Sequence, residues 1–375
     1  MTSARRLFIR LIIFALPFAG LFGAVLGLAI YSGEAMPYRM VLTLQASDHG
    51  VIYRRKHMIP QESFAYKSAA LSLRPPPGVL MLGSSRVLIF QSELLDDPLE
   101  FYNAGMPGIY MDGVATLIDS LTPASAPDVL VIGVDLFWFN AALSIAHRDT
   151  GVFAPIEDNP AWVLESTQRV IQALARGDAR MDDLFARRDP IGRGTALGLD
   201  AQTTGIGYRW DGSMQSNPAY LAKNSRERPA QSYRLFPPTQ AGNTVIFSNF
   251  DELDRVLTRA DELGITVVGF LPPYMPEMYD FMRGSRVHGY VQASRSRLRT
   301  LFLRHKLPLF DFSDVRELGV GGEEMSDFVH PSARLAARMF AVMAREVPAL
   351  RAYADPDRLE AAIAASPDPG IMFGD

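Results

Sequence analysis

The sequence predicts an α/β protein in which a parallel sheet lies between two layers of helices, with a transmembrane helix before it and an insertion within it. Two observations predict this architecture. Short apolar runs alternate with helical segments along most of the chain, as in the βαβ units that build parallel sheets. A long uncharged apolar run precedes the first of these units, near the N-terminus.

Five short runs are predicted as the strands of the sheet. They cover residues 79–82, 100–103, 129–134, 265–271 and 307–312. Most are rich in Val, Ile and Leu without polar alternation, which is typical of strands buried on both faces. Helices are predicted between and after them, at residues 110–121, 161–175, 250–263 and 285–305 and after Pro331. The strands and helices together predict a three-layer sheet.

The apolar N-terminal run starts at Leu11 and ends at Tyr31. At about 1.5 Å per helical residue it spans about 30 Å, the thickness of the hydrocarbon core of a bilayer. Arg5, Arg6 and Arg10 precede it, and positive charge favours retention on the cytoplasmic side. We therefore expect a single-pass protein of the cytoplasmic membrane, with its C-terminal domain exported to the periplasm or the cell exterior.

A cleaved signal peptide is the alternative for this segment. Ala29, Ser32 and Ala35 are small residues that would suit a cleavage site. The run is longer than the roughly 7–15 apolar residues of a signal peptide, which favours an uncleaved anchor.

The chain is predicted to have four parts. Residues 1–35 form the cytoplasmic N-terminus and anchor, 36–77 a juxtamembrane linker, 78–350 the α/β domain, and 351–375 a C-terminal tail. The insertion covers about 141–244 and is rich in Arg, Asp, Gly and Pro. Its aromatic residues, Trp162, Tyr208, Trp210 and Tyr233, give it side chains to bury, so we expect it to pack over the core.

Composition excludes several classes of function. The net charge of −4 and pI near 5.9 argue against binding to nucleic acid. The absence of cysteine excludes disulfides, thiolate metal sites and cysteine nucleophiles. The histidines show no spacing typical of metal ligands, so no metal site and no cofactor are predicted.

Three groups of residues that could take part in catalysis lie at or beyond the carboxyl ends of predicted strands, where ligands bind in open α/β sheets. They are Ser85, the turn at Gly105, and the pair Asp327 and His330. A serine nucleophile needs a base, and the base needs a carboxylate to orient it. Asp327 and His330 are three residues apart, so both can lie on one face of a turn. The sequence therefore predicts a Ser85–His330–Asp327 triad.

These residues also stand in motifs that resemble the SGNH/GDSL hydrolase superfamily. Gly83-Ser84-Ser85-Arg86 resembles its first block, Asn103-Ala104-Gly105 its second, and Asp327-Phe328-Val329-His330 its last. The resemblance covers residues 78–140 and 250–347 in the family's order. It implies a flavodoxin-like hydrolase fold with Ser85 as nucleophile, and it implies that the N–H groups of Ser85 and Gly105 bind the oxyanion. In the first block Ser84 replaces the family's usual Asp and Arg86 follows the nucleophile. This altered block is similar to that of membrane-anchored members associated with acylation of envelope polysaccharides.

The third block departs from the family. The family's Gly-x-Asn-Asp is replaced by Gly133-Val134-Asp135-Leu136, so Asp135 stands where an amide usually donates to the oxyanion. An ionised carboxylate accepts hydrogen bonds only, so we expect Asp135 to be no working donor and Asp135→Asn to raise activity. A protonated Asp135 is the alternative. Arg86 and Tyr274 are candidate substrate contacts. The alternative for each is a structural role: Arg86 would pair with a nearby carboxylate, and Tyr274 would only pack.

The preferred function is that of an esterase or O-acyltransferase acting on acyl esters, with O-acetyl groups preferred, of a cell-envelope glycan. Hydrolysis and transfer are not distinguished by these residues. The resemblance implies a membrane-bound acyltransferase as partner. The alternatives are a non-catalytic SGNH-like module that binds glycan or scaffolds a membrane complex, and a lipid esterase at the bilayer surface.

Overall fold

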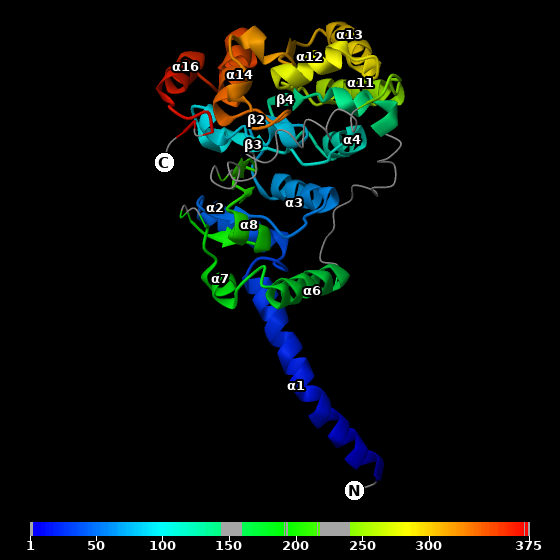
Figure 1. The fold of residues 1–375 in the computed structure, drawn as a ribbon, viewed down its shortest axis with the longest axis vertical. Helices are drawn as coiled ribbons and strands as arrows, with labels where there is room; N and C mark the ends of the chain where they lie inside the picture. Colours follow the sequence, from blue (N-terminus) through cyan, green and yellow to red (C-terminus); the bar gives the residue numbers. More distant parts are fainter. Residues whose placement is uncertain are drawn as a thin grey trace. The chain divides into compact units, whose positions relative to one another are not determined.

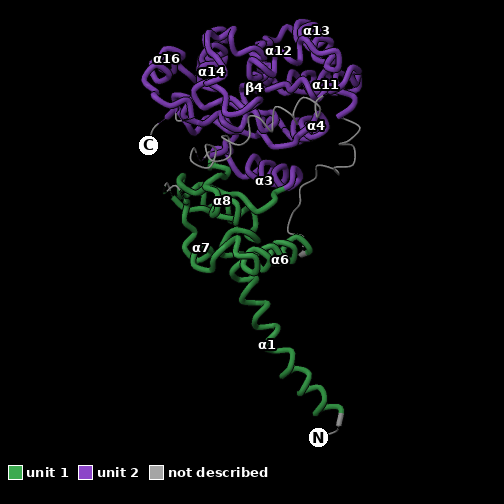
Figure 2. The backbone as a smooth tube through the Cα atoms, viewed as in Figure 1, with its two compact units in different colours: residues 1–58, 156–210 green, residues 59–155, 211–375 purple. Residues whose placement is uncertain are grey.

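The chain divides into two compact units (Figures 1 and 2). The computed structural model describes residues 3–143, 160–190, 192, 194–215, 217, 241–370 and 372–373. Unit 1 comprises Met1–Met58 and Ile156–Trp210, and unit 2 comprises Ile59–Pro155 and Asp211–Asp375. The predicted insertion at 141–244 is thus divided between the units. Parts of it, including Tyr233, lie outside the described residues.

Unit 2 contains the predicted parallel sheet. Its strands are β2 (Val79–Leu82), β3 (Phe101–Asn103), β4 (Val129–Gly133), β8 (Thr266–Leu271) and β9 (Leu309–Asp311). All neighbouring strands are parallel, in the order β3-β2-β4-β8-β9. The first of these strands in the sequence, β2, occupies the second position in this order. The crossover connections therefore run in both directions from β2, as in doubly wound sheets. The prediction of an α/β protein with a parallel sheet is confirmed.

Helices cover both faces of the sheet. On one face, Met81, Val131 and Phe270 pack with α14 (Ala333–Glu346), α15 (Pro348–Arg351) and α16 (Pro356–Ala365) in one apolar cluster. The other face carries α4 (Met111–Asp119), α11 (Ser248–Glu262) and α13 (Gly289–Arg304). Phe302 of α13 lies against the backbone of Gly269 in β8.

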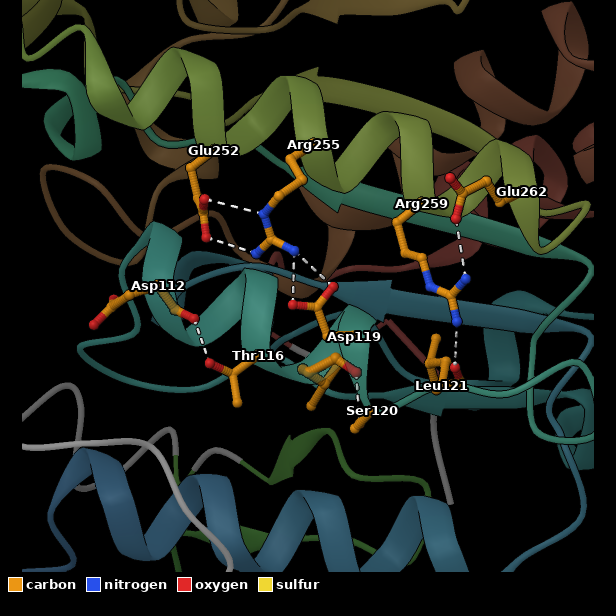
Figure 3. A network of polar contacts seen from close by, with 10 residues as sticks. Asp112, Thr116, Asp119, Ser120, Leu121, Glu252, Arg255, Arg259 and Glu262 are labelled. Carbon is orange, nitrogen blue, oxygen red and sulfur yellow. Dashed lines mark hydrogen bonds and ion pairs between the residues drawn. The ribbon is translucent and has the colours of Figure 1, made fainter.

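An exposed polar network joins α11 to α4 (Figure 3). Arg255 of α11 pairs with Asp119 of α4 at 2.7 Å, and Arg259 donates to the carbonyl of Leu121. The described residues of unit 2 also form α3 (Pro60–Leu73), α12 (Pro276–Gly284) and β7 (Met214–Gln215). They contain the 3₁₀ helices η1 (Ser85–Val87), η2 (Ser92–Leu94), η3 (Pro98–Glu100), η4 (Leu136–Phe139), η5 (Val315–Leu318) and η6 (Gly322–Glu324).

Unit 1 begins with the long N-terminal helix α1 (Ser3–Tyr31). Its segment Ala4–Tyr31 is long and apolar enough to cross a membrane. The described part of unit 1 also contains α2 (Tyr38–Ser47), β1 (Ile52–Tyr53), α6 (Pro160–Arg176), α7 (Met181–Ala186), β5 (Ala196–Leu197), α8 (Leu199–Thr204) and β6 (Gly207–Tyr208). Strand β1 pairs in parallel with β5 and antiparallel with β6.

Two predicted irregular segments contain regular structure. The expected linker, 36–77, contains α2, β1 and α3, with Val41, Tyr53 and Phe64 fully buried. The expected tail, 351–375, contains α16, whose Leu359 and Ile363 belong to the apolar cluster on the sheet. Burial of these side chains stabilises both segments, so neither is a linker or a free tail.

Candidate functional site

The nucleophile candidate lies in a tight turn directly after β2. Ser84 caps the short helix η1, and its buried hydroxyl accepts a hydrogen bond from the N–H of Arg86 at 3.3 Å. Ser85 is the first residue of η1 and is partly exposed. Ser84 therefore fills the capping position of η1, which leaves the Ser85 hydroxyl available for other contacts.

Ser85, His330 and Asp327 form a continuous hydrogen-bonded relay. The Oγ atom of Ser85 lies 2.8 Å from Nε2 of His330, although the two residues are 245 positions apart in the sequence. Nδ1 of His330 lies 2.8 Å from Oδ2 of Asp327. These contacts fit an imidazole that donates to the carboxylate and accepts the serine proton. The structure thus brings the three predicted residues together.

The carboxylate of Asp327 is held by its own turn as well as by the histidine. Its Oδ1 atom accepts hydrogen bonds from the N–H groups of Val329 and His330, both at 2.9 Å. Partial burial opposes its ionisation, but the hydrogen bonds and charge of His330 and the two N–H groups outweigh burial and lower the pKa of Asp327 to about 2. Asp327 is therefore ionised at neutral pH, as an orienting carboxylate must be.

Three glycines at strand ends make room for Val87, which seats η1 on the sheet. A Cβ atom would lie 2.7 Å from Val87 at Gly83, 2.4 Å at Gly105 and 2.6 Å at Gly133. No larger residue fits these positions without displacing the turn that carries Ser85. Asn103 adds a polar connection, since its amide donates to the carbonyls of Val87 at 2.7 Å and Phe90 at 2.9 Å.

Arg86 connects the nucleophile turn to three other segments of the site. Its Nη1 atom lies 2.7 Å from Oδ1 of Asp135, and Nε donates to the carbonyl of Val329 at 2.9 Å. Nη2 donates to the carbonyl of Pro273, and the guanidinium stacks on the ring of Tyr274 at 4.2 Å. Burial lowers the pKa of Arg86, but the neighbouring Tyr274 and Asp135 outweigh it and the net shift is upward. Arg86 is a permanent buried cation.

The structure corrects the predicted substrate contacts. Arg86 is 2% exposed and Tyr274 is fully buried, so neither faces the solvent from which a glycan would approach. Burial also raises the pKa of Tyr274, which remains a neutral phenol below its stacked guanidinium. We reassign both as supports that hold the turns of Ser85 and His330 in place. The sequence shows an arginine beside the nucleophile, but its burial depends on three distant segments.

The predicted oxyanion donors have different surroundings. The N–H of Ser85 has no hydrogen-bond partner among the described residues, so it remains available. The N–H of Gly105 donates to Oδ1 of Asn103 at 2.8 Å and is therefore occupied. Asp135 is buried and paired with Arg86, so its negative charge is compensated and would not simply repel an oxyanion. Its second carboxylate oxygen, Oδ2, has no hydrogen-bond partner among the described residues.

Gly108 is a candidate donor that the sequence analysis did not identify. It follows Gly105 in the same turn, adopts a left-handed φ of 70°, and its N–H has no partner within the described ranges. Met106 anchors this turn to the nucleophile turn, because its N–H donates to the carbonyl of Gly83 at 3.0 Å. The second glycine of the run Ala104-Gly105-Met106-Pro107-Gly108 was the signal available in the sequence.

No protein-family model and no curated protein matches the sequence. Among the described residues, no cluster of three or more His, Asp or Glu side chains could hold a metal ion.

Proposed function

We propose that this protein is a serine esterase or O-acyltransferase in which Ser85 is the nucleophile. The observation that carries the proposal is the relay from Ser85 through His330 to Asp327, with 2.8 Å at each step. A buried structural histidine would not need a partly exposed serine hydroxyl on one nitrogen and an ionised carboxylate on the other.

The reaction follows from these contacts. The Oγ atom of Ser85 attacks the acyl carbonyl while Nε2 of His330 takes the hydroxyl proton. The tetrahedral intermediate collapses, the ester C–O bond breaks, and His330 returns the proton to the departing alcohol. Water or a sugar hydroxyl then attacks the acyl-enzyme and loses its proton to His330. The bond between the acyl carbon and Oγ of Ser85 breaks, and His330 returns the proton to Oγ. Asp327 stabilises the imidazolium in both halves of the reaction.

Backbone N–H groups are the proposed stabilisers of the oxyanion. Among the residues that the structure describes, the N–H groups of Ser85 and Gly108, in the turns after β2 and β3, have no partner, whereas that of Gly105 is bonded to Asn103. Asp135 contributes indirectly, because its pairing with Arg86 neutralises the charge that would otherwise oppose an oxyanion. The missing amide at position 135 then removes one donor, for which losses of about 10²–10³ in rate are typical.

The substrate class and location rest on the resemblance to membrane-anchored SGNH proteins and on α1. We propose an O-acyl, preferably O-acetyl, ester of an envelope glycan as substrate, with unit 2 exported. The arginines at positions 5, 6 and 10 before the apolar segment support retention of the N-terminus in the cytoplasm. A membrane-bound acyltransferase that supplies the acyl group is the corresponding partner.

The second candidate is a non-catalytic SGNH-like module that binds glycan. The carboxylate of Asp135 favours it, since a donor is expected at this position and the structure shows an ion pair instead. The two functions differ in a simple respect: only the enzyme requires Ser85 to be reactive.

Covalent labelling with a fluorophosphonate tests the proposal. The full-length protein in detergent should be labelled on Ser85, and Ser85→Ala should abolish labelling without loss of fold. Ser84→Ala is the matched control, and its effect should be small because the Ser84 hydroxyl only caps η1. Absence of labelling, under conditions that label a serine esterase, would favour the non-catalytic module. Labelling of Ser84 would show that the nucleophile is assigned one residue too late.

A further inference from the structure

Unit 1 carries an exposed apolar surface on the two helices that surround the end of α1. Leu164 and Ile171 of α6 and Met181 and Phe185 of α7 are all 47–57% exposed. We define these four side chains as the α6–α7 surface. Each helix therefore presents two large apolar side chains to the surface beside the end of α1, and exposed apolar surface of this kind can mark an interaction site.

Helix α6 is apolar on two sides. Val170 and Ala173 pack on Leu28 and Ala29 of α1 in one cluster, and Leu184 of α7 belongs to the same cluster. Leu164 and Ile171 are seven residues apart and therefore share a different, exposed side of α6. The contacts with α1 account for one apolar side only, and the side of Leu164 and Ile171 stays exposed.

The length of α1 indicates where this exposed side lies relative to a membrane. The helix is exposed up to Ala24, and its burial against the rest of unit 1 begins at Val25. From Leu11 to Ala24 it spans only about 21 Å, short of the roughly 30 Å of a bilayer core. Counted from Leu11, directly after the last arginine, the uncharged run reaches this length when residues up to Tyr31 are included. The part of unit 1 that covers Leu28 and Ala29 therefore lies at the edge of the hydrocarbon.

Aromatic and basic side chains mark the same level. Tyr31, at the end of α1, contacts Phe185 with ring centroids 6.2 Å apart. The guanidinium of Arg187 stacks on Tyr31 at 3.7 Å. Tyrosine and arginine at the end of an apolar helix are typical of the membrane–water interface. Figure 2 shows α6 and α7 beside the end of α1 within unit 1.

We propose that α6 and α7 are interfacial helices, and that the α6–α7 surface inserts into the boundary between lipid headgroups and acyl chains around α1. The proposal rests on α1 crossing the membrane, which is part of the proposed function, but not on the serine chemistry. Residues 161–190 contain five arginines and five acidic residues. Apolar insertion and not charge therefore drives the contact, and neutral lipid suffices.

Single-cysteine labelling of the full-length protein tests this directly, because the natural chain has no cysteine. Leu164→Cys, Ile171→Cys and Phe185→Cys carry an environment-sensitive fluorophore in phosphatidylcholine vesicles, with nitroxide lipids as quenchers. Phe14→Cys reports whether α1 crosses the membrane. Leu303→Cys in unit 2, apolar and 78% exposed, is the matched control.

We expect blue-shifted emission and loss of most fluorescence at positions 14, 164, 171 and 185, and neither at 303. Quenching at 14 without quenching at 164, 171 and 185 would overturn the interfacial helices while leaving the anchor intact. No quenching at 14 would overturn the anchor itself. Labels that are exposed in vesicles but shielded in native membranes would identify a protein as the occupant and contradict the proposal, as would a requirement for anionic lipid.

Discussion

Replacing Asp135 by Asn should destabilise unit 2 and slow labelling of Ser85. The sequence alone predicted the opposite, because an amide would supply the donor expected at this position. The structure reverses that expectation, since Arg86 and Asp135 are both fully buried and 2.7 Å apart. Asp135→Asn leaves a buried guanidinium without its counter-ion and loosens the turn that carries Ser85.

The magnitude follows from the distance. Two unit charges 2.7 Å apart attract by about 6 kcal/mol at an effective dielectric constant of about 20. Desolvation of both groups offsets most of this attraction, but removing one partner leaves the other uncompensated and costs about 3–5 kcal/mol. Because the amide retains one acceptor for Arg86, we expect Asp135→Asn near the lower end of this range.

The chain offers a matched control on its surface. Arg255 and Asp119 are also 2.7 Å apart, but both are about half exposed and Arg255 keeps a second partner in Glu252 (Figure 3). Asp119→Asn should cost less than about 1 kcal/mol. The contrast between the two Asp→Asn variants separates the effect of burial from that of the ion pair.

A double-mutant cycle measures the coupling in the full-length protein. Arg86→Met, Asp135→Leu and the double variant are compared by hydrogen exchange of the peptides that contain β4 and η1. The double variant should be more stable than either single variant, because no buried charge is left unpaired. Simple additivity, or an Asp135→Asn variant as stable as the wild type, would refute the reasoning.

Three further predictions concern other parts of the protein. Asp327→Asn should slow turnover by about 10⁴-fold by leaving His330 in the wrong tautomer. Since the pKa of Asp327 is about 2, the acid limb of the wild-type pH–rate profile should not arise from its protonation. Gly105→Ala should destabilise by about 1–3 kcal/mol, measured by urea unfolding, since its Cβ would meet Val87 at 2.4 Å. Burial raises the pKa of Glu34 from 4.5 to about 7. The folded state then keeps a proton that the unfolded chain loses, so stability should fall by about 1.4 kcal/mol per pH unit as pH rises from about 4.5 to 7. Glu34→Gln should remove this slope, and an unchanged slope would contradict the assignment.

The sheet and the triad were predictable because their signals are local. Each strand is a short apolar run, and Ser85, Asp327 and His330 each follow a strand in a recognisable motif. Parallel strands place their carboxyl ends at one edge, so motifs far apart in the sequence were expected to meet there.

The remaining features depend on distant partners. Strand β1 is only two residues long and exists because β5 and β6 pair with it from far along the chain. Burial of Arg86 likewise requires Asp135, Pro273 and Val329 from three separate segments. Neither pattern is periodic, so the sequence predicted a linker in the first case and a substrate contact in the second.

Trapping of the acyl-enzyme tests the assignment of Ser85 most directly. The purified full-length protein is mixed with an activated acetyl ester, quenched in acid within the first turnover, digested and analysed by mass spectrometry. We predict one acetyl group on the peptide that contains Ser85, its absence in Ser85→Ala, and its retention in Ser84→Ala. An enzyme that turns over the ester with no acetyl group on Ser85, or with the acetyl group on another residue, would contradict the proposed mechanism.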